Sequence, residues 1–248
     1  MYALPAGAHV SGYWGRGWTF TEASWAMLTK TYAKVLDLSR LSGTKRSYVG
    51  MRDECIADGG RRPPLTPTQF VVQLAERTFT NGKEDRPLVS RLYRDGFTAQ
   101  FERAHSLVYG GLGWGDAECE QLVHVLKEVP CASLTRLVLD DNRLGDSAAR
   151  RLAKVFGEKR FDRLEHLGLY GNVITDAGAR ALRTALCKRR ALTPRLESVA
   201  LRNNLLSPAA YAAFNVALNR RGAAADVHES EVTIFGRPLV VKEMGGAK

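Results

Sequence analysis

The sequence lacks the features that mark several large classes of protein. No apolar run approaches the ~20 residues that a transmembrane helix requires, and the first residues contain neither an apolar signal core nor a positively charged leader. The four cysteines are scattered, without a C-x-x-C pair or histidines at zinc spacing, so we expect free thiols and a cytoplasmic protein. Aromatic residues form only 8% of the chain, but 45% hydrophobic residues exclude a disordered chain.

Motifs for common enzyme chemistry are missing as well. The chain has no G-x-S-x-G, P-loop, H-E-x-x-H or Rossmann fingerprint, and none of its five histidines has a second metal ligand at helix or strand spacing. Asp140 and Asp141 are adjacent, but no third carboxylate lies in the same repeat. We therefore expect a non-enzymatic protein with no catalytic residue, metal site, cofactor or small-molecule substrate.

What the sequence contains instead is an internal repeat. Three segments of one pattern begin at Leu134, Leu164 and Leu196, and a degenerate copy begins at Ala104, so the spacings are 30, 30 and 32 residues. In each copy, alternating leucines predict a short strand, and a following alanine-rich segment predicts a helix. Repetition at such a period is typical of stacked supersecondary units.

Polar residues at fixed positions of the repeat predict how the units are capped. An asparagine follows each strand and can bond backbone groups of the neighbouring turn: Asn142, Asn172 and Asn203–Asn204. Apolar residues after them are expected to point into the core: Leu144, Ile174 and Leu206. Helix N-caps are predicted at Asp116, Asp146, Asp176 and Ser207, the last followed by Pro208.

The repeats from about Ala104 to Arg221 resemble the leucine-rich-repeat family, in particular its ribonuclease-inhibitor-like class. The resemblance implies an α/β fold: a short solenoid with parallel strands on its concave face and helices on its convex face. It divides the chain into a mainly helical region (1–103), about four repeats (104–222) and a C-terminal part (223–248). In that last part, Glu231–Glu243 predicts a β-hairpin cap, and Met244–Lys248 is expected to fray.

The first copy departs from the pattern, because Tyr109 replaces a strand leucine and Leu112 replaces the asparagine. We expect it to be a terminal repeat that packs against the N-terminal region.

The N-terminal region contains three helical patterns. One begins at Thr19 or Thr21 and runs to about Leu38, with Trp25, Leu28, Tyr32 and Val35 as its apolar stripe. A capping box at Thr66–Gln69 predicts a second helix to about Phe79, which Asn81-Gly82 would end. A third helix is predicted after Asp85, with Leu88, Leu92 and Phe97 on one face, and Tyr48–Met51 is read as a short strand.

A ten-residue segment, Tyr13–Glu22, resembles the R-x-W-T-x-x-E element of heterokaryon-incompatibility (HET) domains and the W-x-x-x-E element of Toll/interleukin-receptor (TIR) domains. The resemblance implies a degenerate signalling domain, of which only the back half would be present, and it places Glu22 at the catalytic glutamate of NAD-cleaving TIR domains. The alternative is structural: Trp18 would be buried, and Arg16 would pair with Glu22 near a helix start.

The repeat phase predicts which side chains point out of the concave sheet. One column contains Arg136, His166 and Ser198, and the next contains the small residues Val138, Gly168 and Ala200. Two further columns follow the strands: Asp140, Tyr170 and Arg202, then Asp141, Gly171 and Asn203. Tyrosine and arginine are frequent hot spots of protein interfaces, so we expect these columns to bind a protein.

The net charge of +10 and the pI of 9.7 suggest a second kind of partner. Residues 1–105 carry 15 basic and 10 acidic side chains, residues 106–222 carry 18 and 12, and the tail carries 3 and 4, so the excess is spread over both halves. Basic residues of the repeats lie mainly on the helices and after them, with a run at Lys188, Arg189 and Arg190.

The leading hypothesis is therefore a protein-binding or scaffold protein that uses the concave face, with Arg136, Asp140, Asp141, His166, Tyr170, Arg202 and Asn203 as its contact residues. Two alternatives remain. The chain could be a component of a ribonucleoprotein assembly that contacts RNA through Lys188, Arg189 and Arg190. It could also be the degenerate HET/TIR-like signalling protein.

Overall fold

The computed structural model of the chain describes residues 15–30, 41–44, 47–56 and 61–225. Within these residues the fold is α/β, as predicted. Five parallel strands form one sheet and pair in chain order: β1 (Ser106–Val108), β2 (Arg136–Val138), β3 (His166–Gly168), β4 (Ser198–Ala200) and β5 (Ala224–Ala225). A helix follows each of the first four: α5 (Asp116–Glu128), α6 (Asp146–Glu158), α7 (Asp176–Lys188) and α8 (Pro208–Arg221).

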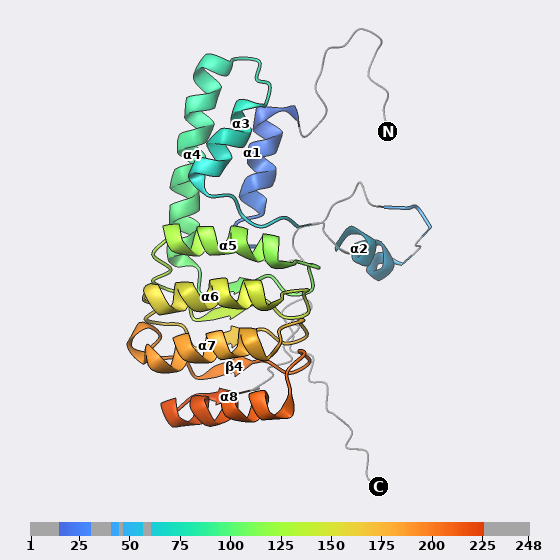
Figure 1. Cartoon of the computed structure of the whole chain (residues 1–248). Helices are drawn as coiled ribbons and strands as arrows, with labels where there is room; N and C mark the ends of the chain where they lie inside the picture. Colours follow the sequence, from blue (N-terminus) through green and yellow to red (C-terminus); the bar gives the residue numbers. More distant parts are fainter. Residues whose placement is uncertain (1–14, 31–40, 45–46, 57–60, 226–248) are drawn as a thin grey trace.

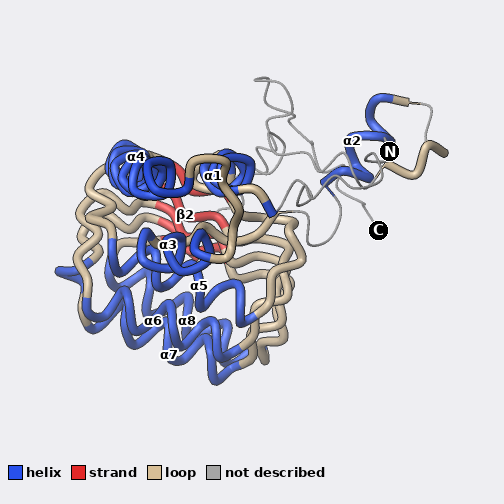
Figure 2. Tube along the Cα trace, turned by 90° about the horizontal axis from the view of Figure 1, so that it is seen from above, coloured by secondary structure: helices blue, strands red, loops and turns tan. Residues whose placement is uncertain are grey.

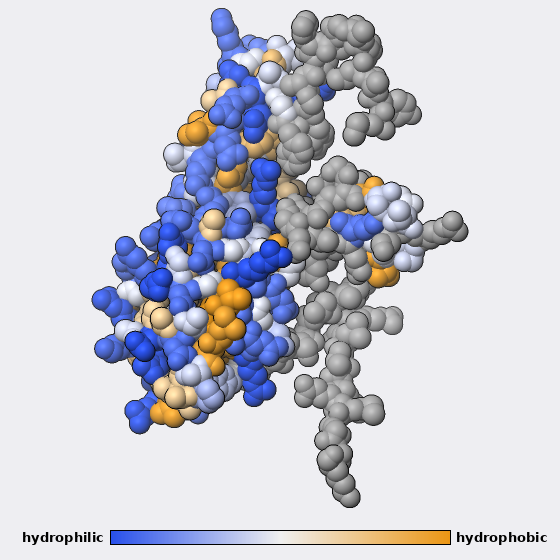
Figure 3. Space-filling model, turned by 45° about the vertical axis from the view of Figure 1, so that its right-hand side comes forward, coloured by the Kyte–Doolittle hydropathy of each residue, from blue (hydrophilic) through white to orange (hydrophobic). Residues whose placement is uncertain are grey.

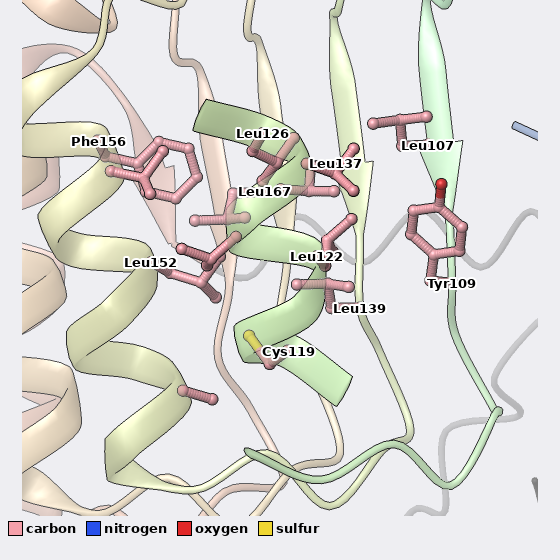
Figure 4. Close-up of a cluster of buried hydrophobic side chains, with 14 of the residues drawn as sticks. Leu107, Tyr109, Cys119, Leu122, Leu126, Leu137, Leu139, Leu152, Phe156 and Leu167 are labelled. Carbon is pink, nitrogen blue, oxygen red and sulfur yellow. The ribbon is translucent and has the colours of Figure 1, made fainter. Parts of the chain in front are cut away.

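Consecutive helices lie side by side and cover one face of the sheet (Figures 1 and 2). The layer between strands and helices is closely packed, and residues at equivalent repeat positions meet there (Figure 4). Leu107, Leu137 and Leu167 are at most 1% exposed at the centres of their strands. Leu122 and Leu152 approach them from α5 and α6. Each such side chain stabilises the fold by about 1.5–3 kcal/mol relative to an exposed one.

The asparagines form the predicted ladder. The Asn172 side chain accepts a hydrogen bond from Leu144 N at 3.0 Å and donates to the carbonyls of Leu139 and Leu169 at 3.0 and 3.1 Å. Asn142 and Asn204 make equivalent bonds one repeat before and after. At the pair Asn203–Asn204, the structure therefore assigns the ladder position to Asn204.

The aspartates cap helices, but not their own. Asp146 is the first residue of α6, and its Oδ1 accepts hydrogen bonds from Thr175 N and Gly178 N at the start of α7. Asp116 and Asp176 do the same for the next repeat. The predicted N-caps at Asp116, Asp146 and Asp176 are thus wrong: Gly115, Gly145 and Thr175 hold that position. Ser207 is an N-cap as predicted and accepts from Ala210 N.

Helices α1 (Gly17–Ala26), α3 (Pro67–Ala75) and α4 (Gly82–Arg103) pack together at the β1 end of the stack (Figure 1). The capping box at Thr66 and Gln69 is confirmed. Asn81 begins α4 instead of ending the helix before it, because Asn81 Nδ2 donates to Glu84 Oε2 in the first turn. The buried stripe of α4 is Val89, Tyr93, Phe97 and Phe101, so Leu88 and Leu92 are only half-buried.

Two other predictions for this region are wrong. Residues 48–51 are not a strand, because Ser47 Oγ accepts from Gly50 N and helix α2 (Tyr48–Ile56) follows. The first helix starts at Gly17, not at Thr19 or Thr21, because Gly17 N bonds the carbonyl of Thr78. It ends at Ala26, although Leu28 is fully buried as expected. Tyr32, Val35 and the predicted hairpin at Glu231–Glu243 lie outside the described residues.

The first repeat packs against the N-terminal region, as its unusual sequence predicts. The Arg61 guanidinium lies 4.6 Å over the Tyr109 ring and donates to the carbonyl of Met27 at 3.1 Å. The Tyr109 hydroxyl donates to the carbonyl of Leu28 at 2.5 Å, and the Trp114 indole donates to that of Arg61 at 2.9 Å. Met27 and Leu28 directly follow α1, so these bonds tie the end of that helix to Arg61 and Tyr109.

The asparagine ladder makes a testable contribution to stability. Asn172→Ala leaves Leu144 N and two buried carbonyls without their partner, and each such group costs about 1–3 kcal/mol. We expect the free energy of unfolding, measured by urea denaturation, to fall by about 3 kcal/mol. Asn219→Ala, which removes an exposed amide on α8, is the matched control and should stay within about 0.5 kcal/mol. Equal losses would contradict a structural role for the ladder.

The aspartate caps predict a pH dependence of stability. Burial opposes the charge of Asp146, but hydrogen bonds from Thr175 and Gly178 outweigh it, so the pKa of its carboxyl lies below the ordinary 3.8. A folded-state pKa below the unfolded one adds stability above that unfolded pKa, and this contribution is lost as the pH falls below it. Asp146→Asn should therefore lower the urea midpoint at neutral pH and flatten its fall below about pH 4.

Asp95→Asn, an exposed change on α4, is the control for this experiment. An acid limb as steep in Asp146→Asn as in the unchanged protein would contradict the assignment.

Candidate functional site

Parallel pairing places the predicted contact residues in rows on the sheet face, by which we mean the face opposite α5–α8. Arg136, His166 and Ser198 are direct partners in the register of β2, β3 and β4. Val138, Gly168 and Ala200 form the next row in the same way. These rows are the columns that the repeat phase predicts, and the prediction is thus confirmed for the residues within the strands.

His166 has a partner that the repeat pattern did not predict. Its Nδ1 lies 2.7 Å from the Ser198 hydroxyl on the next strand, and Ser198 is only 9% exposed. A serine beside a histidine can act as a nucleophile when an acidic group orients the other side of the ring. Arg136 occupies the same row on β2. The register thus brings a hydroxyl, an imidazole and a guanidinium into one polar row.

Asp140 fills the space over a glycine on the neighbouring strand. Its Oδ1 accepts a hydrogen bond from Tyr170 N at 2.9 Å. A Cβ atom on Gly168 would lie 2.6 Å from the same oxygen, so any other residue there would require the Asp140 carboxylate to move. The sequence showed Gly168 only as one of the small residues of its row, because the steric demand comes from a residue 28 positions away.

Tyr170 and its neighbours form the other end of the site. The Asn203 amide donates to the Tyr170 hydroxyl, and Arg202 Nε lies 3.4 Å from the Tyr211 hydroxyl on α8. Asp141 and Asn203 both have positive φ angles, 52° and 54°, at equivalent turn positions. Aspartate and asparagine tolerate this left-handed conformation better than most residues do. These contacts hold the aromatic ring and the guanidinium at the ends of β3 and β4.

All seven predicted protein-contact residues thus lie on the sheet face or directly after its strands. Lys188, Arg189 and Arg190 do not join them. These three are exposed at the end of α7 and at the start of the connection to β4, beyond the helix layer. The two predicted surfaces are therefore separate.

Other candidate chemistry finds little support in the described residues. No group of three histidine, cysteine, aspartate or glutamate side chains there could hold a metal ion. Burial raises the pKa of the Cys119 thiol to about 12 and that of Cys131 to about 11, so neither is a reactive thiolate at neutral pH. In that part of the chain, no helix has the length and apolar content needed to cross a bilayer.

The segment that resembles HET and TIR domains lies at the start of α1. Glu22 is exposed on this helix. Trp18 is 43% exposed, and its indole donates to Asp85 Oδ2 at 3.2 Å. The expectation that Trp18 is buried is therefore wrong, because the ring lies between α1 and the start of α4 and not under them.

Neither a protein-family model nor a curated protein matches the chain.

The fit of Asp140 over Gly168 can be tested by a double-mutant cycle. Gly168→Ala should displace the Asp140 carboxylate, break its bond to Tyr170 N and lower the free energy of unfolding by about 1 kcal/mol. In an Asp140→Ala background, Gly168→Ala meets no carboxylate and should not lower the free energy of unfolding through this clash. The difference between the two backgrounds is the coupling energy. Additive effects of the two substitutions would show that the carboxylate does not restrict residue 168.

Proposed function

We propose that the chain is a leucine-rich-repeat protein of the ribonuclease-inhibitor-like class. Four strand–turn–helix units in direct succession support the proposal. Asparagines that bond the turns of adjacent units support it as well. The strand leucines and helix leucines meet in one core between the two layers, and that core continues into α1, α3 and α4.

On this basis we propose a non-enzymatic function, the recognition of a protein partner by the sheet face. The observation that carries the proposal is the register, which aligns a row of small residues between two rows of polar ones. Gly168 and Ala200 are themselves buried, Gly168 beneath the Asp140 carboxylate, so the side chains of the flanking rows form the surface offered to a partner. Tyr170 and Arg202 beside them are residue types that often dominate binding energy at interfaces.

The charges of the sheet face suggest the character of the partner. Arg136 and His166 lie at the first residues of β2 and β3, whereas Asp140 and Asp141 follow the end of β2 and Arg202 follows the end of β4. A complementary surface would carry both signs of charge around an apolar centre. Such an arrangement favours a folded protein surface over a uniformly charged polymer.

We expect the double substitution Tyr170→Ala/Arg202→Ala to remove bound proteins in affinity purification from a native extract, quantified by mass spectrometry. Loss of two interface hot spots weakens binding by about 100-fold or more. The matched control is Tyr48→Ala/Arg94→Ala, which removes the same residue types from α2 and α4. Circular dichroism and the melting temperature establish that both variants fold.

Partners that the double variant retains at unchanged intensity would refute recognition by the sheet face. Ribonuclease treatment of the same samples separates direct protein partners from those held through RNA.

A further inference from the structure

A second surface of the repeats has a composition that the fold does not require. Five cations lie where α7 and α8 end, and together we call them the basic edge: Lys188, Arg189, Arg190, Arg195 and Arg220. All five are exposed. Within the described residues, none of them has an ion pair with an N–O distance of 4.0 Å or less.

Stabilisation of the helix end does not account for these cations. A positive charge at a helix C-terminus is favourable, because the last carbonyls lack partners. At α7 another residue supplies it: Arg221, only 6% exposed, donates to the carbonyl of Leu186 at 2.7 Å and to Thr193 Oγ1 at 3.1 Å. The exposed cations of the basic edge are therefore additional to this cap.

In the preceding repeat, the equivalent cations in the turn after α6 are bonded to other groups of the protein. Lys159 follows α6, and its ammonium donates to the carbonyls of Leu126 and Val129 at the end of α5. Arg160 forms an ion pair with Asp162. The first two cations after α6 are thus bonded within the protein, whereas Lys188, Arg189 and Arg190 form no ion pair among the described residues.

The positive charge is concentrated in the last two repeats. Residues 116–175 contain nine basic and ten acidic side chains, whereas residues 176–221 contain nine basic and two acidic ones. Of the two acids, Asp176 bonds Ser207 at the opposite end of the helices, so only Glu197 lies in the connection to β4.

The surroundings of the basic edge indicate which anionic partner it fits. Its chain segments, 188–195 and 217–222, contain no aromatic residue. Of the exposed large apolar side chains in the last two repeats, Val173 and Leu205 precede α7 and α8, at the other ends of these helices, and Val216 lies alone on α8 one turn before Arg220. Apolar patches interrupt an otherwise hydrophilic surface in Figure 3. A specific protein interface needs an apolar centre, whereas contact with phosphates needs only cations.

We propose that the basic edge binds the phosphate backbone of a nucleic acid without reading its base sequence. Four of the five cations are arginines, whose planar forks bond phosphate oxygens in pairs. Without aromatic side chains, the edge cannot stack unpaired bases, so contacts to the backbone of a duplex suit it best. This binding is independent of the sheet face and of the partner proposed for it.

The first test measures the affinity of the full chain for a short fluorescent duplex RNA by anisotropy at several salt concentrations. If four cations contact phosphates, affinity should fall by roughly 100-fold between about 50 and 200 mM salt. Duplex RNAs of unrelated sequence should bind with the same affinity. A dissociation constant that does not change with salt would overturn the proposal.

The second test replaces the cations. Lys188→Gln/Arg189→Gln/Arg190→Gln should weaken RNA binding by about 30-fold or more at low salt and make the salt dependence shallower by about three phosphate contacts. The matched control, Lys83→Gln/Arg91→Gln/Arg94→Gln, removes the same number of exposed cations from α4. It should bind nearly as well as the unchanged protein.

An equal loss in the control would overturn the proposal, because it would show attraction to net charge alone. Unchanged binding of the first variant would overturn it too. Since that variant alters a helix end, Arg195→Gln/Arg220→Gln provides an independent change, for which we expect a loss of about tenfold. Tighter binding of anionic lipid vesicles than of duplex RNA, abolished by the same variants, would assign the edge to a membrane surface and contradict the proposal.

Discussion

The structure depends on one constraint, the satisfaction of buried backbone groups of each repeat by side chains of an adjacent repeat. Asn172 bonds the turn of the repeat before it, while Asp146 bonds the start of the helix after it. Such groups cost free energy when they are buried without partners. A single repeat cannot supply these partners for itself, so stability requires several repeats stacked in one register.

This constraint explains the unusual ends of the repeat region. The first strand has no repeat before it, and the N-terminal helices occupy that place. Tyr109 and Trp114 replace the residues of the common pattern and bond Leu28 and Arg61 there. Arg61 is buried and has no ion pair among the described residues, and carbonyl groups and an aromatic ring lie around its charge. Burial lowers the pKa of this guanidinium, which nevertheless stays protonated at neutral pH.

The same reasoning separates structural charge from charge available to partners. Lys159 and Arg221 have lowered pKa values because they are partly withdrawn from water, and they bond carbonyls at helix ends. The net charge of the sequence is therefore larger than the positive charge that the surface of the protein presents to partners. Within the repeats, the surplus of basic over acidic side chains lies in residues 176–221, and its exposed members at the ends of α7 and α8 are separate from the mixed charges of the sheet face. The two surfaces suit partners of different chemistry.

By itself, the sequence determined the α/β class, the places of β1–β4 and of α5–α8, and the rows of the sheet face. These features follow a local pattern that recurs every 30 to 32 residues, and the repetition makes each one legible. Only the tertiary structure decided where α1 ends, which helix each aspartate caps, why residue 168 is glycine and which cations are exposed. Each of these depends on contacts between residues far apart in the chain, which a pattern read over a few neighbours does not encode.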